Sequence, residues 1–294
     1  MLETKKDVEK LKKWLKKCLS PTEDPPDTAI VRLIVMKTHE IKGAKAIWNN
    51  SKTIDLTFGN RFSMWKFCVL MHKILHDGHS QVLSDGLLFQ EQLIKYANYW
   101  RAQSSDYAMS ECIVRYCQVL NRKISFHNTY PMFKGSFRLN DDSCLDVNSS
   151  FALCLDICDY LEDLLQLQRA VFQNLAMHNI SADSKKGSCR LLPLVTIIDE
   201  CGILYEHCVT VLQSLHYQMP TEDISGLADR FSSVIFHELL YFFEYVRSNN
   251  LTPNSVEIPT LPMAVPIQVN RVVADLRHFP EPSAPSIMDF MLSS

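Results

Sequence analysis

The chain is short of glycine. Only eight of its 294 residues are glycine, which is under half of the share of about 7% that soluble proteins usually have. Enzymes that bind nucleotides or activate a serine often need glycines in a loop that closely approaches a ligand or a nucleophile, and none of the patterns GxGxxG, GxxxxGKS/T or GxSxG occurs here. Because these motifs are absent, the sequence gives no support to nucleotide-binding or serine-hydrolase chemistry.

Long hydrophobic runs are also missing. No stretch of about 18 apolar residues free of charge occurs, so the sequence predicts no helix that crosses a bilayer. The chain opens with lysines and acids, where a secretory signal needs an apolar segment. We therefore expect a protein that works in the cytoplasm.

No cysteine pair has the CxxC spacing that is typical of metal and redox motifs, although the chain contains ten cysteines. Most of them lie among apolar residues. We therefore predict that the cysteines are reduced and buried, where they pack as small hydrophobic side chains. Cys154 and Cys158 are one helical turn apart and are flanked by Leu153, Leu155 and Ile157. We interpret this pair in the same way, as packing and not as a metal or redox site.

Positive charge is concentrated in one place. Residues 1–20 contain seven lysines and three acids, although the whole chain carries a net charge of −3. A protein that binds nucleic acid is usually basic over a broad face, so we expect no nucleic-acid partner. Residues 3–19 predict an amphipathic helix with an apolar face that includes Trp14 and a lysine face opposite to it. Such a face suits anionic lipid headgroups, and an ordinary first helix with solvated lysines is the alternative.

Helical periodicity dominates the rest of the chain. It predicts a second helix that starts at Asp27 or Thr28 and a short helix at 44–50. Residues 51–60 favour a loop over an isolated strand. Further helical segments are predicted at 61–77, 83–102, 105–127, 148–178, 188–217 and 221–248, with a long loop at 128–147. The last 44 residues hold seven of the thirteen prolines. We therefore predict an all-α domain at 1–250 and a Pro-rich irregular tail at 251–294, partly packed on the domain and partly disordered.

Catalytic chemistry has little support in the sequence. His72, His76 and His79 form the densest histidine cluster, and the spacing of the first two is typical of zinc ligands on a helix. No fourth ligand and no HExxH glutamate accompany them. The alternative is a helix end with favourably placed histidines, followed by a capping Gly78. We predict no catalytic residue, no metal and no cofactor, and a helical metalloenzyme remains the third hypothesis.

Five segments follow one another in a fixed order: the most specific is MWKFCVLMHKILHDGHSQVLSD (Met64 to Asp85), and the others lie at 37–48, 146–162, 187–220 and 256–262. Together they resemble the ANTH domains of the Huntingtin-interacting-protein family of clathrin-associated endocytic adaptors. The resemblance extends over about residues 15–285. It implies a right-handed superhelical stack of about eight to ten helices. It also implies phosphoinositide binding and contacts with clathrin coat proteins and the actin machinery, at the plasma membrane and on clathrin-coated vesicles.

The lipid-binding motif of that family is only partly present. The pattern is a lysine, nine residues, and then Lys-x-Lys-His. Alignment of the downstream segments places Lys17 on the first lysine and Asp27-Thr28-Ala29-Ile30 on the basic cluster. One lysine cannot replace several charge-assisted bonds to phosphate, and Asp27 would repel it. Lys12, Lys13 and Lys16 are our candidates to compensate, and Lys37, Lys42 and Lys45 to extend the patch.

The sequence therefore supports two main functional hypotheses. The first is an endocytic adaptor module that binds anionic phospholipid through Lys12, Lys13, Lys16 and Lys17 and has no catalytic activity. The second is a helical protein-interaction scaffold that has lost phosphoinositide binding. These residues contain no heptad coiled coil and no talin-like module. We therefore expect actin linkage to lie outside them. Headgroup preference and oligomeric state stay open.

Overall fold

The computed structural model describes residues 5–57, 60–103, 106–139 and 145–263. Within these ranges the chain is helical and forms no β-strand, which confirms the predicted all-α class. The elements are α1 (Lys5–Cys18), α2 (Thr28–Ile41), α3 (Lys45–Ser51), α4 (Arg61–Asp77), α5 (Gln81–Leu87), α6 (Gln90–Arg101), α7 (Tyr107–Thr129), α8 (Val147–Met177), α9 (Lys185–Arg190), α10 (Leu194–Gln218), α11 (Thr221–Arg230), a π-helical segment η1 (Phe231–Phe236) and α12 (His237–Ser248).

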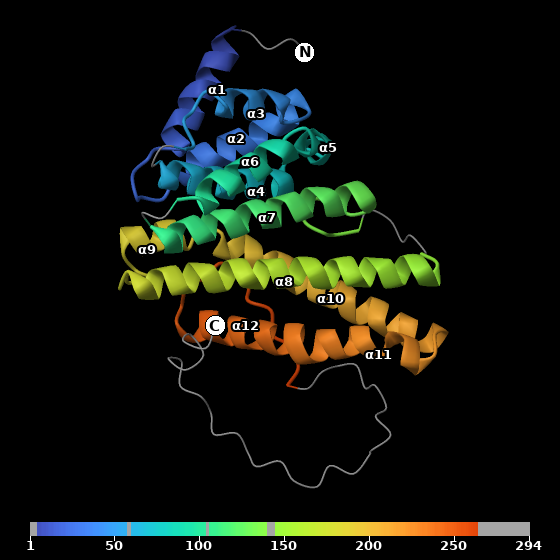
Figure 1. The fold of residues 1–294 in the computed structure, drawn as a ribbon. Coiled ribbons are helices and arrows are strands. Elements are labelled where there is room, and N and C mark those ends of the chain that lie inside the picture. Colours follow the sequence, from blue (N-terminus) through green and yellow to red (C-terminus); the bar gives the residue numbers. More distant parts are fainter. Residues whose placement is uncertain (1–4, 58–59, 104–105, 140–144, 264–294) are drawn as a thin grey trace.

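The helices stack in the order of the sequence. Figure 1 shows α1, α2 and α3 at one end, then α4 to α7, then α8 with α10, and finally α11 and α12 at the other end. Of the described helices, nine have ten or more residues, in keeping with the expected eight to ten, and α3, α5 and α9 are shorter. None of the described helices combines the length and the hydropathy needed to span a bilayer. The basic first helix is thus at one end of an elongated stack.

Aspartate side chains cap the starts of three of the described helices. The Asp27 carboxylate accepts a hydrogen bond from the backbone N–H of Ala29 at 3.0 Å, so the second helix starts where the sequence predicted. Asp106 caps α7 and Asp146 caps α8 in the same manner. Two long predicted segments are divided in the structure: 83–102 becomes α5 and α6, and 188–217 becomes α9 and α10. Periodicity could not predict these breaks, because the apolar pattern continues across them.

The interior contains a polar cluster as well as hydrophobic side chains. Lys123 of α7 and Glu200 of α10 form an ion pair of 2.6 Å, and both side chains are fully buried. The Tyr160 hydroxyl of α8 donates to the same carboxylate at 2.7 Å, and His72 of α4 lies 3.1 Å from it. Four helices therefore meet at Glu200. Burial by itself raises the pKa of Glu200, yet His72 and Lys123 beside it outweigh burial and hold that pKa well below its usual range.

The predicted loop at 128–147 packs tightly where it is described. Lys123 donates to the backbone carbonyl of Gly135 at 2.7 Å, and its ammonium lies 4.1 Å from the centre of the Phe137 ring. A Cβ atom at position 135 would lie 2.0 Å from the carbonyl oxygen of Leu75, so this position accepts only glycine. The buried lysine thus fastens the loop to the helical stack.

The C-terminal part of the described chain packs on the body. Arg247 of α12 donates to the carbonyl oxygen of Pro259 at 3.1 Å, and Leu261 is buried. A side chain at position 202 of α10 would collide with the ring of Pro259. The segment 251–263 therefore lies on the helical stack. Residues 264–294 lie outside the described part, and the domain boundary at residue 250 stays a prediction.

Candidate functional site

The first helix presents a basic face at the end of the stack. Lys13, Lys16 and Lys17 are exposed, and their spacing of three and four residues places them on one side of α1. Within the described ranges, neither Lys13 nor Lys16 forms an ion pair. Lys12 is half-buried and pairs with Glu9 at 3.1 Å. Of the four proposed lysines, Lys13 and Lys16 are therefore the strongest candidates for an external anion.

The opposite face of α1 packs against the protein. Leu11, Leu15 and Cys18 are buried, and the half-buried Trp14 lies under the ammonium of Lys10 at 4.8 Å from the ring centre. Helix α1 contacts α2 and α3. The sequence left open whether this apolar face packs on the body or enters a membrane. In the structure it packs on the body, which leaves the lysines as the part of α1 that faces outward.

The connection between α1 and α2 is held rigidly. The buried stem of Lys66 in α4 brings its ammonium to the carbonyl oxygens of Ser20 and Thr22, at 3.0 and 2.8 Å. Arg190 at the end of α9 pairs with Glu23 at 2.7 Å. These bonds come from α4 and α9, far away in the sequence. They hold the segment directly after the C-terminal end of α1, so the lysine face of α1 has a defined position relative to the other helices.

Lys17, the one lysine that matches the family motif, forms an ion pair at the protein surface. Its ammonium lies 3.2 Å from the carboxylate of Asp27, and 66% of the lysine side chain and 44% of the aspartate side chain are exposed. The hydrogen bond from Lys17, followed by the backbone N–H of Ala29, lowers the pKa of Asp27. Asp27 thus has two roles, because it caps α2 and holds Lys17. The sequence predicted the capping role and the repulsion of phosphate by Asp27, but not its ion pair with Lys17, since the path of residues 19–26 was unknown.

The proposed extension of the patch is less favourable. The Lys37 ammonium pairs with Glu40 at 3.0 Å, and only 14% of the lysine side chain is exposed. Lys45 is exposed but lies 3.8 Å from the buried carboxylate of Asp85. Lys42 is exposed and follows α2 with a positive φ of 55°. Lys37 thus lies in α2, Lys42 directly follows it and Lys45 begins α3, and two of the three already have a carboxylate partner.

The three histidines of the proposed zinc cluster serve separate structural purposes. His72 is fully buried and bonds with Glu200 and Tyr116. The ring nitrogens of His76 bond with Asp77 at 2.6 Å and Asp199 at 2.9 Å, and His79 accepts the backbone N–H of Gln81. The geometry gives the zinc hypothesis no support. Gly78 does cap α4 as predicted, in an extended conformation.

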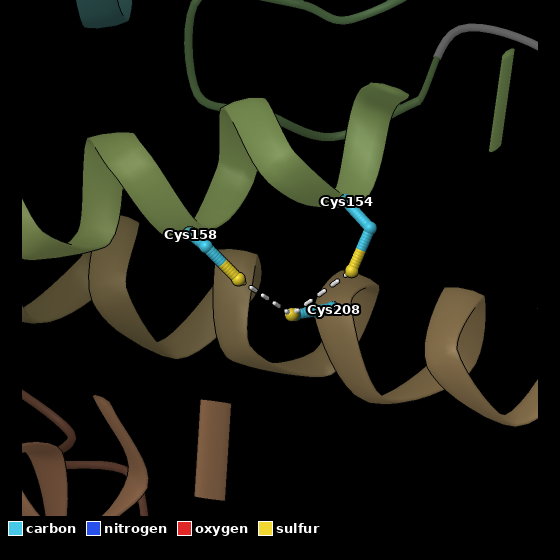
Figure 2. Close-up of side chains that lie close together, drawn as sticks. All are labelled: Cys154, Cys158 and Cys208. Atoms are coloured by element: carbon cyan, nitrogen blue, oxygen red, sulfur yellow. Dashed lines mark hydrogen bonds between the residues drawn. The ribbon is translucent and has the colours of Figure 1, made fainter. Parts of the chain in front are cut away.

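The described cysteines are free thiols and buried, as predicted; Cys144 lies outside the described residues. Figure 2 shows that three of them meet between α8 and α10. The sulfur of Cys208 lies 3.6 Å from that of Cys154 and 3.7 Å from that of Cys158. Hydrogen bonds from the thiols of Cys154 and Cys208, with a contribution from the charge of Arg230, lower the pKa of Cys158 against the opposing effect of burial. Within the described residues this is the one group in which three metal-ligating side chains place their ligand atoms within 4.8 Å of one another.

Comparison with proteins of known sequence identifies the family. The ANTH domain model matches residues 10–271. Huntingtin-interacting protein 1 of Homo sapiens is 34% identical over 238 residues, which cover 79% of this chain and 22% of that protein. Endocytosis protein end4 of Schizosaccharomyces pombe is 24% identical over 277 residues, covering 92% of this chain and 24% of that protein. The chain thus spans less than a third of the length of these curated relatives.

Comparison with solved structures agrees with this family at the level of the fold. The ENTH domain from epsin-2 in complex with phosphatidylinositol 4,5-bisphosphate superposes with a TM-score of 0.75 at 20% identity, covering 89% of this chain and 100% of that chain. The endocytic adaptor complex AENTH gives a TM-score of 0.71 at 21% identity, covering 86% of this chain and 98% of that chain. The resemblance predicted from five sequence segments is therefore confirmed, and the chain belongs to the ANTH domain family.

Proposed function

We propose that this chain is the membrane-binding module of an endocytic adaptor, without catalytic activity, and that α1 contacts anionic phospholipid headgroups, phosphoinositides in particular. The observation that carries the proposal is the exposed lysine face of α1, with Lys13 and Lys16 unpaired among the described residues. Family membership supports the adaptor role. The solved epsin-2 complex shows a protein of this fold with a phosphoinositide bound.

The chemistry of binding follows from the geometry of α1. Each lysine near an anionic membrane contributes about 1 kcal/mol of attraction. Lys13, Lys16 and Lys17 are exposed and Lys12 is partly so, hence their sum gives weak binding that falls as salt is added. Because the apolar face of α1 is buried, binding through this surface rests on charge and not on insertion. This predicts a peripheral position at the cytoplasmic leaflet, and clathrin coat proteins and the actin machinery follow as proposed partners from the family alone.

Liposome cosedimentation tests the proposed site. Lys13→Glu/Lys16→Glu should abolish sedimentation with vesicles that contain phosphatidylinositol 4,5-bisphosphate, and the wild type should bind less as salt rises. The control is Lys95→Glu/Arg101→Glu on α6, which makes the same change in charge at two exposed positions. Binding that both double variants retain equally would refute the assignment to α1. Circular dichroism melts confirm that both variants are folded.

The second candidate, a protein-interaction scaffold without lipid binding, is favoured by one specific observation. The residues at the positions of the family's basic cluster include no base, and Asp27 among them already occupies Lys17. This function predicts that the wild type sediments with no phosphoinositide at physiological salt, yet still recovers clathrin coat proteins in a pull-down. Sedimentation that depends on phosphoinositide would exclude it.

A further inference from the structure

The strongest unexplained feature lies far from the basic face. Cys154 and Cys158 are one turn apart on α8, and Cys208 projects from the facing helix α10 (Figure 2). All three side chains are fully buried. Packing requires only that a small apolar side chain fill each position. It does not require three sulfur atoms to converge on one another.

We propose that Cys154, Cys158 and Cys208 form a three-coordinate site for a soft monovalent cation, and that its ion is Cu(I). This site is independent of the membrane contact proposed above, which lies on α1. Soft sulfur ligands such as thiolate select Cu(I). Two ligands from one helix and one from its neighbour would tie α8 to α10.

The spacing of the sulfur atoms fits a planar, three-coordinate ion. A metal–sulfur bond of about 2.3 Å places three sulfurs around a central ion about 4 Å apart from one another. The measured separations from Cys208 are 3.6 and 3.7 Å, and all three sulfurs lie within 4.8 Å of one another. The two separations from Cys208 therefore differ by only a few tenths of an ångström from those of a closed three-sulfur shell.

The number of ligands favours Cu(I) over Zn²⁺. Structural zinc sites are almost always tetrahedral with four protein ligands, and catalytic zinc sites have three protein ligands and a water in the fourth position. In the described part of the chain, no histidine or carboxylate joins the three sulfurs. The complete burial of the thiols also leaves no open side for a fourth ligand from water. A cation that is satisfied by three thiolates matches this environment.

Binding changes protonation and leaves the oxidation states alone. The thiols that coordinate the ion release their protons to solvent, and copper enters and remains as Cu(I). No disulfide forms and no electron moves. The test therefore uses copper supplied as Cu(I), with a phosphine reductant and without oxygen.

The experiment measures copper retention by the full chain against a chromogenic Cu(I) chelator. The wild type should retain stoichiometric copper, and Cys208→Ala should lose it. The matched control is Cys112→Ala in α7, a buried cysteine outside the cluster. Cys154→Ala, on the other helix, should lose copper in the same way and covers the case in which Cys208→Ala fails to fold by circular dichroism.

X-ray absorption of the copper-loaded chain should show a shell of three sulfurs and no nitrogen or oxygen. Equal copper retention by the wild type and both cluster variants would overturn the proposal, since other cysteines would then hold the metal. A shell that contains nitrogen or oxygen would overturn it as well. Preferential retention of Zn²⁺ when both metals are offered would overturn the choice of copper.

Discussion

Two lysine–carboxylate ion pairs, one at the surface and one in the core, show how solvent exposure decides whether a charged pair is available for binding or only stabilises the fold. Lys17 and Asp27 lie at the surface, 3.2 Å apart, with most of the lysine side chain in solvent. Lys123 and Glu200 lie in the core, 2.6 Å apart, with no exposed area. Water competes for the first pair, so its lysine can exchange one anion for another. The second pair cannot separate without leaving a buried charge unpaired.

The buried pair gives the largest expected effect. Glu200→Gln keeps the shape of the side chain but leaves the ammonium of Lys123 buried without its counter-charge. We expect the free energy of unfolding to fall by about 3–5 kcal/mol, measured by urea denaturation. Lys123→Met/Glu200→Gln should recover part of this loss, because the unpaired charge is then gone. A loss smaller than about 1 kcal/mol would show that water reaches Lys123.

The second-largest expected effect is a loss of stability in acid that arises from the buried His127. Burial lowers the pKa of His127 to about 3, whereas an unfolded histidine titrates near 6.5. Between these values the unfolded chain binds a proton that the folded chain does not, so this residue destabilises the fold progressively as pH falls through that window. His127→Phe should reduce the acid sensitivity by a few kcal/mol between pH 6.5 and pH 4. The measurement is urea denaturation at several pH values.

The prediction for His127 is tested by comparing two curves of unfolding free energy against pH, one for the wild type and one for His127→Phe. The pKa of His76 is raised in the folded chain, so protonation of His76 stabilises the fold as pH falls. His76 is present in both the wild type and His127→Phe. The difference between the wild type and His127→Phe therefore isolates His127. Parallel curves of stability against pH would contradict the prediction, whatever their vertical offset.

The surface pair gives the smallest effect, which is on binding and not on stability. Asp27→Asn retains a residue that caps helices as well as aspartate does, and it removes the negative charge beside Lys17. The affinity for anionic vesicles, measured by cosedimentation, should rise by about fivefold at most, because one lysine charge becomes available. Thermal melts should coincide with those of the wild type. Unchanged affinity together with unchanged melts would remove Lys17 from the proposed site.

Local chemistry made part of the site predictable. The lysine face of α1 follows from helical periodicity, and the start of α2 follows from the capping ability of Asp27. The ion pair that joins the two was not predictable. It depends on how Lys66 and Arg190, from distant helices, hold the connection at residues 19–26. A sequence pattern reports neighbours along a helix and says nothing of such contacts.

The contrast between local sequence patterns and contacts among distant helices also applies to the interior. The sequence by itself determined the all-α class, the buried cysteines and the family, because periodicity, hydrophobicity and ordered motifs are local properties. Only the tertiary structure decided that Cys208 meets Cys154 and Cys158, and that Glu200 meets Lys123 and His72. Those partners are 50 to 128 residues apart in the chain. Their meeting is set by the packing of whole helices, which brings side chains from distant parts of the chain together.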